Sequence, residues 1–327
     1  MDENPTARSA LAAWGSMVDV ACIDVLPRAT NPLWRVGAAN GQTFVLKLLP
    51  EFPPGVSPVE EFRVLSHLQE CGVPVAVPIL TDDAAIHTTV GNRLYALLPF
   101  LPSEPGNHES GPDAAETAFT IGGAIGQMNR ALAACPWQLH SFVDDPGRQI
   151  LVEALSGLPE EATRPILPFT DRLRDAIRDL PTQLTHGDCN DGNVLVRDRR
   201  VSGFIDFDHL PVGPRVRDLS YYLASRVRTH LAQPETASRD TRAMLAVLDH
   251  YVAGYHLAHP LTRPELGAIV PLMLLVEVGG AHWCLNGWEP DLEGYRQSLR
   301  SIDWISAHID ELTAAAEIGH RGARPSA

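Results

Sequence analysis

The segment Leu184-Thr185-His186-Gly187-Asp188-Cys189-Asn190-Asp191-Gly192-Asn193-Val194-Leu195-Val196 predicts a tight polar loop that leads into a short apolar strand. A second segment, Ser202-Gly203-Phe204-Ile205-Asp206-Phe207-Asp208, reads as an apolar strand that ends in two carboxylates. The intervening Arg197-Asp198-Arg199-Arg200 predicts a turn, so we expect the two strands to pair as a hairpin. That hairpin would bring Asn193 and Asp206 to neighbouring points on one surface.

These residue types match the needs of phosphoryl transfer from ATP. The reaction requires oxygen ligands for Mg²⁺, a carboxylate that orients and deprotonates the attacking hydroxyl, and a cation on the phosphates. Asn193 and Asp206 are the candidate magnesium ligands, and Asp188 is the candidate base. Lys47 is the candidate phosphate-binding cation, and Glu61 is expected to hold it by an ion pair.

Lys47 is the only lysine in the chain, and arginine fills every other Lys-or-Arg position. A compact ammonium is not chemically replaced by a planar guanidinium, so a single lysine is a candidate for a special position. A genome biased towards arginine codons, or an ordinary strand-edge lysine, is the alternative interpretation. Lys47 falls in the β-rich segment 43–49, directly after the turn signal Asn40-Gly41. We therefore expect it on the second strand of a hairpin.

A short amphipathic helix is predicted after this hairpin. Ser57-Pro58 opens it and Gly72 closes it. Glu61 lies on this helix, with Glu60 beside it as a competitor for the same role. Solvated helix residues remain the alternative interpretation of both carboxylates.

The chain is expected to fold into two lobes. Residues 1–100 mix strands with one helix, and prolines and glycine at 97–106 predict a hinge. Residues 107–327 are mainly helical, so the predicted fold class is α+β, with a mostly antiparallel N-terminal sheet. Strands are expected within 20–50, 74–80, 93–100 and 185–207, and helices at 121–132, at 169–180 and beyond 219.

The pattern His186-x-Asp188-x-x-x-x-Asn193, followed by Ile205-Asp206-Phe207-Asp208, resembles the aminoglycoside phosphotransferase superfamily. That superfamily includes small-molecule kinases for homoserine, choline and hydroxylysine, and it has a protein-kinase-like two-lobe fold. The resemblance covers roughly residues 20–310 and rests on four or five short motifs. It implies that Asp188 is the catalytic base, that Asn193 and Asp206 bind Mg²⁺, and that ATP is the phosphate donor.

The resemblance also implies which residues contact the nucleotide. Lys47 would bind the ATP phosphates, and Leu97, Pro99 and Leu101 would meet adenine at the hinge. A glycine-rich loop is absent; residues 28–34 occupy its place, and Asn31 within them is a predicted nucleotide contact. Where family members often carry a histidine, this chain has an asparagine, Asn129.

Two further residues are expected to support the loop rather than react. His186 is expected to bond loop backbone, and Asp218 is expected to anchor the loop through hydrogen bonds. Asp208 is a candidate substrate contact, with a second metal ligand or a turn cap as alternatives. Asp and Asn also favour turns by themselves, which is the plainer interpretation of the whole loop.

A small-molecule hydroxyl acceptor is favoured over a protein substrate. Gly187 stands where protein kinases place an arginine, and eleven residues separate Asp206 from Asp218, which leaves little room for a peptide platform. Glu277 and Trp283 are candidate contacts for an amine-bearing acceptor, through ion pairing and cation–π interaction. Core packing is the alternative for Trp283. The Asn190-Asp191 pair resembles the hydroxylysine-kinase-like branch, whereas the chain length and the C-terminal half resemble the homoserine-kinase-like branch, so the acceptor stays open.

Composition limits the remaining classes. The net charge is −14 and basic runs are absent, so no nucleic-acid partner is expected. The longest apolar run, 267–276, is too short to span a bilayer, and the polar N-terminus is not a signal peptide. Five scattered cysteines suit a reducing cytoplasm. A monomer or homodimer is expected.

Three other functions stay open on the sequence. The first is a catalytically silent nucleotide-binding scaffold, although every catalytic side chain is present. The second is a metal-dependent hydrolase that uses His186, Asp188 and Asp206. The third is a Ser/Thr protein kinase.

Overall fold

The computed structural model describes residues 4–15, 17–26, 32–50, 58–104, 112–137, 139, 144–232, 241–287 and 289–322. The chain divides into two compact units. The N-terminal unit contains Met1–Pro102, Gln138–His140 and Gly203–Asp208, and the C-terminal unit contains Ser103–Trp137, Ser141–Ser202 and His209–Ala327. The second half of the motif quoted above therefore folds with the N-terminal unit.

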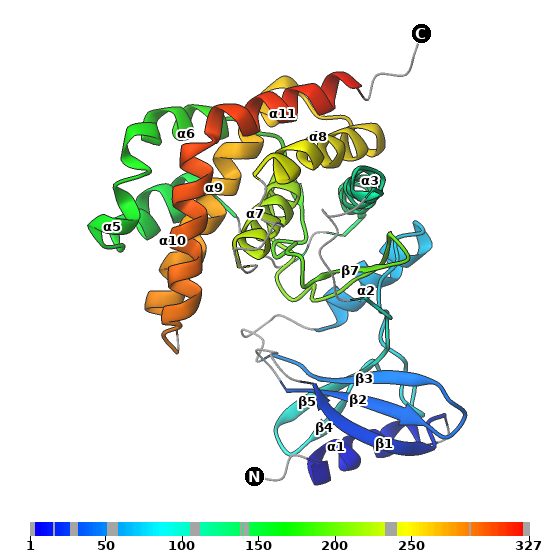
Figure 1. The fold of residues 1–327 in the computed structure, drawn as a ribbon. Helices are drawn as coiled ribbons and strands as arrows, with labels where there is room; N and C mark the ends of the chain where they lie inside the picture. Colours follow the sequence, from blue (N-terminus) through cyan, green and yellow to red (C-terminus); the bar gives the residue numbers. More distant parts are fainter. Residues whose placement is uncertain are drawn as a thin grey trace. The chain divides into compact units, whose positions relative to one another are not determined.

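An antiparallel sheet of five strands forms the N-terminal unit (Figure 1). Side chains alternate between buried and partly exposed along its central strands, as one covered face requires. Asn40-Gly41 turns the chain between β2 and β3, with Gly41 at φ +85°, so the predicted hairpin is confirmed. The strands run in the order β1 (Val20–Leu26), β2 (Leu33–Ala38), β3 (Thr43–Leu48), β5 (Arg93–Pro99) and β4 (Thr88–Val90).

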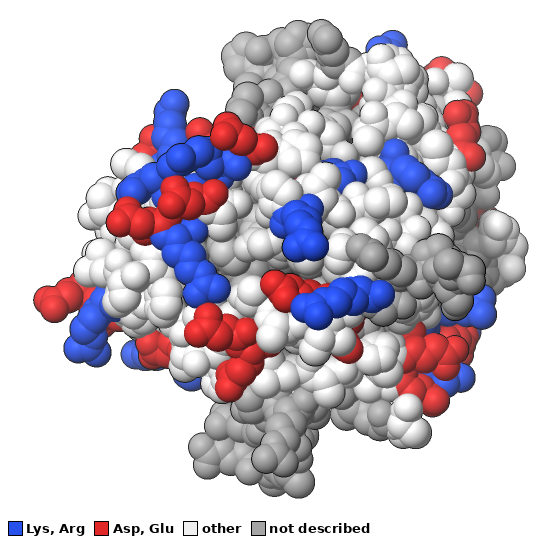
Figure 2. Space-filling view, turned by 90° about the horizontal axis from the view of Figure 1, so that it is seen from above, with Lys and Arg blue, Asp and Glu red and all other residues white. Residues whose placement is uncertain are grey.

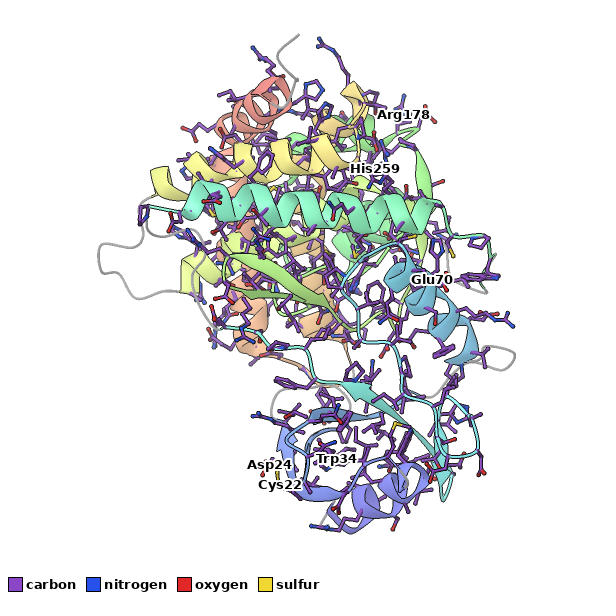
Figure 3. All side chains as sticks on the ribbon, turned by 90° about the vertical axis from the view of Figure 1, so that its right-hand side faces the viewer. Cys22, Asp24, Trp34, Glu70, Arg178 and His259 are labelled. Carbon is purple, nitrogen blue, oxygen red and sulfur yellow. The ribbon has the colours of Figure 1, made fainter. Side chains whose placement is uncertain are left out.

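Helix α1 (Asn4–Leu11) and a following 3-10 turn (Ala12–Trp14) pack against this sheet. The sequence predicted no helix there. Trp14 is fully buried and donates a hydrogen bond from Nε1 to the Ile79 carbonyl at 2.8 Å. Trp34 lies in the same core, whereas Cys22 and Asp24 lie at the outer edge (Figure 3).

Helix α2 (Pro58–Glu70) matches the predicted helix. Its buried side chains are Val64, Leu65 and Leu68. Gly72, at φ +79°, ends it through a Schellman motif, because the Val73 N–H bonds the Leu68 carbonyl and the Gly72 N–H bonds the Gln69 carbonyl.

The strand predicted at 74–80 is wrong. This segment makes only two isolated bridges, Val75 with Phe204 and Ile79 with Leu97. Pro74 and Pro78 lack the N–H groups that a ladder needs. The bridge to Phe204, with its N–H bonded to the Pro74 carbonyl at 2.8 Å, ties residues 203–208 into the N-terminal unit.

The C-terminal unit is mainly helical (Figure 1). Helices α3 and α8 approach so closely that a Cβ on Gly122 or Gly254 would lie 2.0 Å from a backbone oxygen of the other helix. The predicted helices at 121–132 and 169–180 correspond to α3 and α6. The helices are α3 (Ala114–Ala133), α4 (Pro146–Arg148), α5 (Glu160–Thr163), α6 (Thr170–Ile177), α7 (Val216–Ala232), α8 (Thr241–Ala258), α9 (Arg263–Asn286), α10 (Leu292–Ala307) and α11 (Ile309–Gly322), with a π-helix at Gln149–Ala154 and a 3-10 helix at Leu167–Phe169.

Short strands frame the polar loop quoted at the start. β6 (Thr182–Leu184) precedes the loop and pairs antiparallel with β9 (Val212–Pro214). β7 (Val194–Arg197) follows it and pairs with β8 (Arg200–Phe204). The predicted hairpin is thus present, and its turn residues Asp198 and Arg199 both have positive φ, as a type I′ turn requires.

Helix α9 is long and apolar enough to cross a bilayer by length and composition, and 67% of its 18-residue apolar window is buried inside the protein. It continues through Pro271, so the helix extends beyond both ends of the apolar run 267–276. Its burial is that of a core helix.

Candidate active site

The polar loop is held by a buried carboxylate. Asp218, in the first turn of α7, accepts hydrogen bonds from the N–H groups of His186 (2.9 Å) and Gly187 (3.0 Å). Burial raises the pKa of Asp218, and these bonds together with nearby positive charge oppose the rise. Gly187 has φ +83°, and a Cβ there would lie 2.5 Å from Pro211, so only glycine fits.

Three side chains surround the carboxylate of Asp188. Asn193 donates from Nδ2 to the Asp188 carbonyl and to Oδ2, both at 2.9 Å. Asn190 donates from Nδ2 to Oδ1 at 3.0 Å. Tyr221, on α7, hydrogen-bonds the same carboxylate, and burial and Asp188 raise the pKa of its phenol. The sequence missed Tyr221; its one available signal is its place, one helical turn after Asp218.

Asp191 forms its hydrogen bonds with side chains of α7. Its carboxylate accepts hydrogen bonds from Arg226 Nη1 at 3.0 Å and from Thr229 Oγ1 at 2.5 Å. Its N–H donates to Ser225 Oγ at 2.9 Å. One helix therefore fixes both ends of the loop, through Asp218 and through these contacts.

Lys47 lies on β3, on a position that alternates with the buried Leu46 and Leu48. Its Nζ contacts Asp206 Oδ1 at 2.9 Å and Asp208 Oδ1 at 2.5 Å. Burial by itself would lower the pKa of Lys47, but the charges of Asp208 and Asp206 outweigh it and raise the pKa. Lys47 is therefore a fully charged ammonium clamped between two carboxylates.

Asp206 and Asp208 differ in exposure. The Asp206 side chain is 47% exposed and that of Asp208 is 16% exposed. Asp206 has φ +66°, a left-handed conformation that a non-glycine residue adopts at a cost and that is concentrated at functional sites. Its oxygen-rich, accessible position fits a divalent cation.

The predicted ion pair between Glu61 and Lys47 needs correction. The direct contacts of Lys47 go to Asp206 and Asp208 instead, and Glu61 acts on it through longer-range charge. Burial, and next the charge of Asp208, raise the pKa of Glu61 to about 7. Asp206 and Asp208 lie more than 150 residues after Lys47 in the chain, yet they contact its ammonium in place of Glu61, which is nearer in sequence.

The predicted hinge residues differ in their availability to a ligand. Leu97 is fully buried and its carbonyl accepts a hydrogen bond from the Ile79 N–H at 2.7 Å, so it is not positioned to meet adenine. Pro99 ends β5, and Leu101 follows it and packs against Gly203. Asn31 lies outside the described residues.

The predicted acceptor contacts on α9 do not form one box. Glu277 is fully buried, and Arg228 binds its Oε1 at 2.8 Å and its Oε2 at 3.3 Å. Ser298 also hydrogen-bonds this carboxylate. Trp283, six residues later, is 67% exposed, so it is not a core residue either. The Glu277 carboxylate is stable within the apolar run because Arg228 pairs with it.

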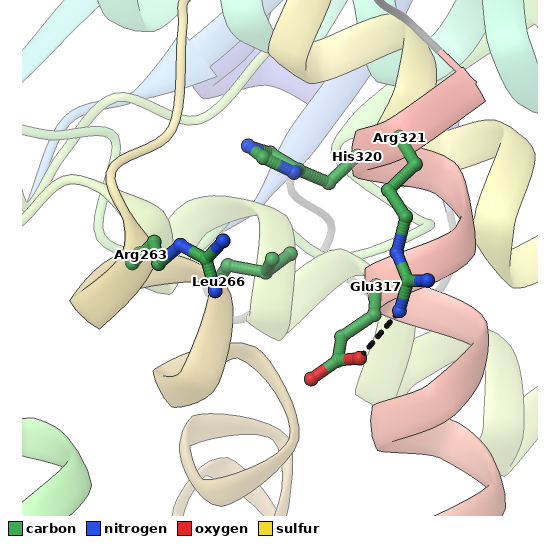
Figure 4. Close-up of a pocket in the computed structure, with 5 residues that line it drawn as sticks. All are labelled: Arg263, Leu266, Glu317, His320 and Arg321. Atoms are coloured by element: carbon green, nitrogen blue, oxygen red, sulfur yellow. Dashed lines mark hydrogen bonds and ion pairs between the residues drawn. The ribbon is translucent and has the colours of Figure 1, made fainter.

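Two surface features lie outside these clusters. An open cavity of about 520 Å³ is lined by Arg263, Leu266, Glu317, His320 and Arg321, where Arg321 pairs with Glu317 at 2.9 Å (Figure 4). It contains none of the residues singled out from the sequence. On the face shown in Figure 2, acidic and basic side chains are interspersed.

Among the residues that the structure describes, no three His, Cys, Asp or Glu side chains form a metal-binding group. The neighbourhood of Asn193 and Asp206 stays a prediction, because the two residues belong to different units. The part of the loop motif inside the C-terminal unit, from His186 to Asn193, is brought together around Asp188.

Comparison with known proteins identifies relatives along most of the chain. The family model described as "Phosphotransferase enzyme family" matches residues 25–263. The chain is 24% identical over 295 residues to the serine/threonine protein kinase RdoA of Salmonella typhimurium, which covers 86% of this chain and 83% of the relative.

Two solved structures have the same fold. Amicoumacin kinase hAmiN, in complex with AMP-PNP, Ca²⁺ and Ami, gives a TM-score of 0.68 at 16% identity and covers 94% of both chains. The microcompartment-associated aminopropanol kinase gives a TM-score of 0.68 at 15% identity, over 97% of this chain and 99% of that one. The predicted α+β, protein-kinase-like fold is confirmed.

Proposed function

The chain belongs to the phosphotransferase enzyme family and is a kinase of that family, and we propose that it transfers the γ-phosphate of ATP to a hydroxyl of a small amino-bearing molecule. The observation that supports this proposal is that hydrogen-bond donors surround the Asp188 carboxylate. Asn190, Asn193 and Tyr221 each donate a hydrogen bond to it, so its orientation is fixed before an acceptor arrives.

Asp188 acts as the base in this proposal. Its carboxylate accepts the proton of the acceptor hydroxyl while that oxygen attacks the phosphate. Asp218 keeps the loop backbone in place, which makes it a positioning residue. His186 contributes through its ring, since Nδ1 accepts the Asp188 N–H at 3.3 Å.

Asp206, Asp208 and Asn193 are the proposed holders of a divalent cation, with Mg²⁺ as the physiological ion. Asn193 uses Nδ2 on Asp188, so its Oδ1 is the atom suited to a metal. The cation, when bound, would neutralise the phosphate charge that develops during transfer. The AMP-PNP and Ca²⁺ bound to amicoumacin kinase support a nucleotide and a divalent ion in this fold.

Lys47 is the proposed phosphate-binding cation, and Pro99 with Leu101 is the proposed adenine-binding segment. Lys47 is already charged and on a rigid strand, which suits a contact to phosphate oxygens. In this proposal Lys47 exchanges its carboxylate partners for the nucleotide when a cation occupies Asp206.

An amino-bearing alcohol is the proposed acceptor class. The net charge of −14 favours cationic ligands, and the exposed Trp283 offers an aromatic face. One structural neighbour is named for aminopropanol, an amino alcohol. We propose that the enzyme works in the cytoplasm, where ATP and Mg²⁺ are supplied.

ADP release with Mg·ATP across amino alcohols, sugars and aminoglycosides tests the proposal. Asp188→Asn should keep ATP affinity but lower acceptor-dependent turnover by ~10²–10⁴, the usual contribution of a general base. Asp171→Asn, whose carboxylate is 92% exposed on α6, is the matched control and should behave as the native protein. Unchanged turnover in Asp188→Asn would remove this residue from the mechanism.

A protein hydroxyl is the second candidate acceptor. It is favoured by the relative that aligns with 86% of this chain, which is named a serine/threonine protein kinase. Incubation of a generic protein substrate with ATP labelled at the γ-phosphate separates the two, since only this candidate predicts label in protein. ATP binding with no transfer to either class would support a scaffold role.

A further inference from the structure

One face of α7 contacts the polar loop that contains Asp188 and Asp191. Tyr221, Ser225 and Arg228 follow each other at spacings of four and three residues, which places them on one side of the helix. Tyr221 hydrogen-bonds Asp188, and Ser225 accepts the Asp191 N–H. The same face therefore carries Arg228 to the neighbourhood of the loop.

Arg228 is anchored from behind by Glu277 of α9. Nη2 donates to Oε1 at 2.8 Å and Nε to Oε2 at 3.3 Å, so one edge of the guanidinium is fixed. Helices α7, α9 and α10 pack against one another (Figure 1). Among the described residues, Glu277 is the carboxylate that pairs with Arg228, and the charge of Asp191 also acts on it.

Of the two residues in this ion pair, only Arg228 has side-chain surface exposed to solvent. The Glu277 side chain is 0% exposed, whereas that of Arg228 is 31% exposed. Arg228 is thus the member of this pair whose side chain a ligand can reach. A guanidinium whose orientation is already fixed by a buried carboxylate is suited to bind a second carboxylate with little loss of side-chain entropy.

We propose that Arg228 binds a carboxylate on the acceptor, so that the acceptor is a hydroxy acid with an amino group rather than a plain amino alcohol. The inference rests on the proposed function, since it concerns the same site. It reverses the role expected for Glu277, which orients Arg228 and does not meet the amine of the acceptor.

Three matched acceptor pairs test this inference, because the two members of each pair differ only in a carboxylate. The pairs are homoserine and 3-amino-1-propanol, serine and ethanolamine, and threonine and 1-amino-2-propanol. ADP release is measured with Mg·ATP, and binding is measured by calorimetry with Mg²⁺ and AMP-PNP. We expect the carboxylated member of at least one pair to have a KM at least tenfold lower and to bind measurably.

The decisive variant is the double substitution Arg228→Gln with Glu277→Gln, which leaves no buried charge without a partner. It should bring the KM ratio within a pair close to one, because the KM of the carboxylated member rises more than that of the neutral member. Arg228→Lys keeps the charge, loses the two-pronged geometry, and should raise the KM of the carboxylated member severalfold. Arg296→Gln, 63% exposed on α10, is the matched control.

The outcomes separate the inference from the proposed function. Turnover with equal KM values for both members, unchanged in the Arg228 variants, overturns the inference and leaves the kinase proposal standing. Carboxylate binding that depends on Arg228, without transfer to any acceptor, supports the inference and overturns the proposed reaction. If no carboxylated acceptor binds or is turned over, that result overturns the inference directly. Thermal unfolding of each variant checks that it folds.

Discussion

Lys47 is the residue on which the N-terminal half of the site depends. Its ammonium contacts Asp206 and Asp208, which are otherwise two carboxylates close enough to repel one another. Burial raises the pKa of Asp208, and Lys47 opposes that rise. Lys47 thus neutralises the two carboxylates and is itself the cation proposed to contact the ATP phosphates.

Replacing Lys47 by arginine tests whether charge alone suffices. Lys47→Arg keeps the charge but brings a longer planar fork into a site shaped for a point charge. We expect the KM for ATP to rise roughly tenfold, equivalent to about 1.4 kcal/mol, in steady-state kinetics. Arg63→Lys, an exposed change on α2, serves as the control. Native ATP affinity and turnover in Lys47→Arg would make the lysine incidental.

At the scale of elements, α7 is the helix that organises the C-terminal half of the site. Its first turn supplies Asp218 to the loop backbone, and its next turns supply Tyr221 and Ser225. Arg215, just before the helix, binds Glu265 through Nε and Nη2. Glu265 also completes a capping box with Thr262 at the start of α9, so the two helices are joined near the loop.

His259 gives this junction a predictable pH dependence. Its Nε2 lies 2.5 Å from Arg215 Nη1, and burial, then the charge of Arg215, lowers its pKa to about 4. An unfolded histidine has a pKa near 6.5, so the unfolded state binds the proton first and stability falls as the pH drops from about 7 towards 4.

Urea unfolding at pH 7 and pH 4.5 checks this. His259→Gln should lose less stability than the native protein over that interval, by about 1 kcal/mol after allowing for partial solvent screening. His67→Gln, on the last turn of α2, is the control. Equal losses in the native protein and in His259→Gln would contradict the coupling to Arg215.

At the scale of the whole molecule, the candidate groups are divided between the two units. Lys47, Asp206 and Asp208 belong to the N-terminal unit, whereas Asp188 and Asn193 belong to the C-terminal unit. A ligand that needs groups from both units should stabilise the chain by mass action. Binding at 100 times Kd contributes about 2.7 kcal/mol.

Thermal unfolding with AMP-PNP therefore gives a molecular test of the metal proposal. Mg²⁺ with AMP-PNP should raise Tm by several degrees, and Asp206→Ala should remove that rise because a charged oxygen ligand is lost. Addition of EDTA to the native protein should have the same effect. An undiminished rise in Asp206→Ala would exclude Asp206 as a metal ligand.

The sequence alone determined the features whose partners are close in the chain. Gly72 ends α2, and the turn at 198–199 joins β7 to β8, because both depend on local backbone geometry. The sequence also indicated that residues 184–193 form one tight loop, and within this loop Asn193 contacts Asp188 across five residues.

Only the tertiary structure decided the partners of side chains that lie far apart in sequence. Lys47 pairs with Asp208 across 161 residues, and Glu277 takes Arg228 across 49 residues. A buried charge is stable only beside a partner of opposite charge. Tertiary packing decides which partner that is, so pattern and spacing in the sequence do not identify it. Tyr221 went unnoticed for the same reason: its link to Asp188 follows from how α7 lies against the loop.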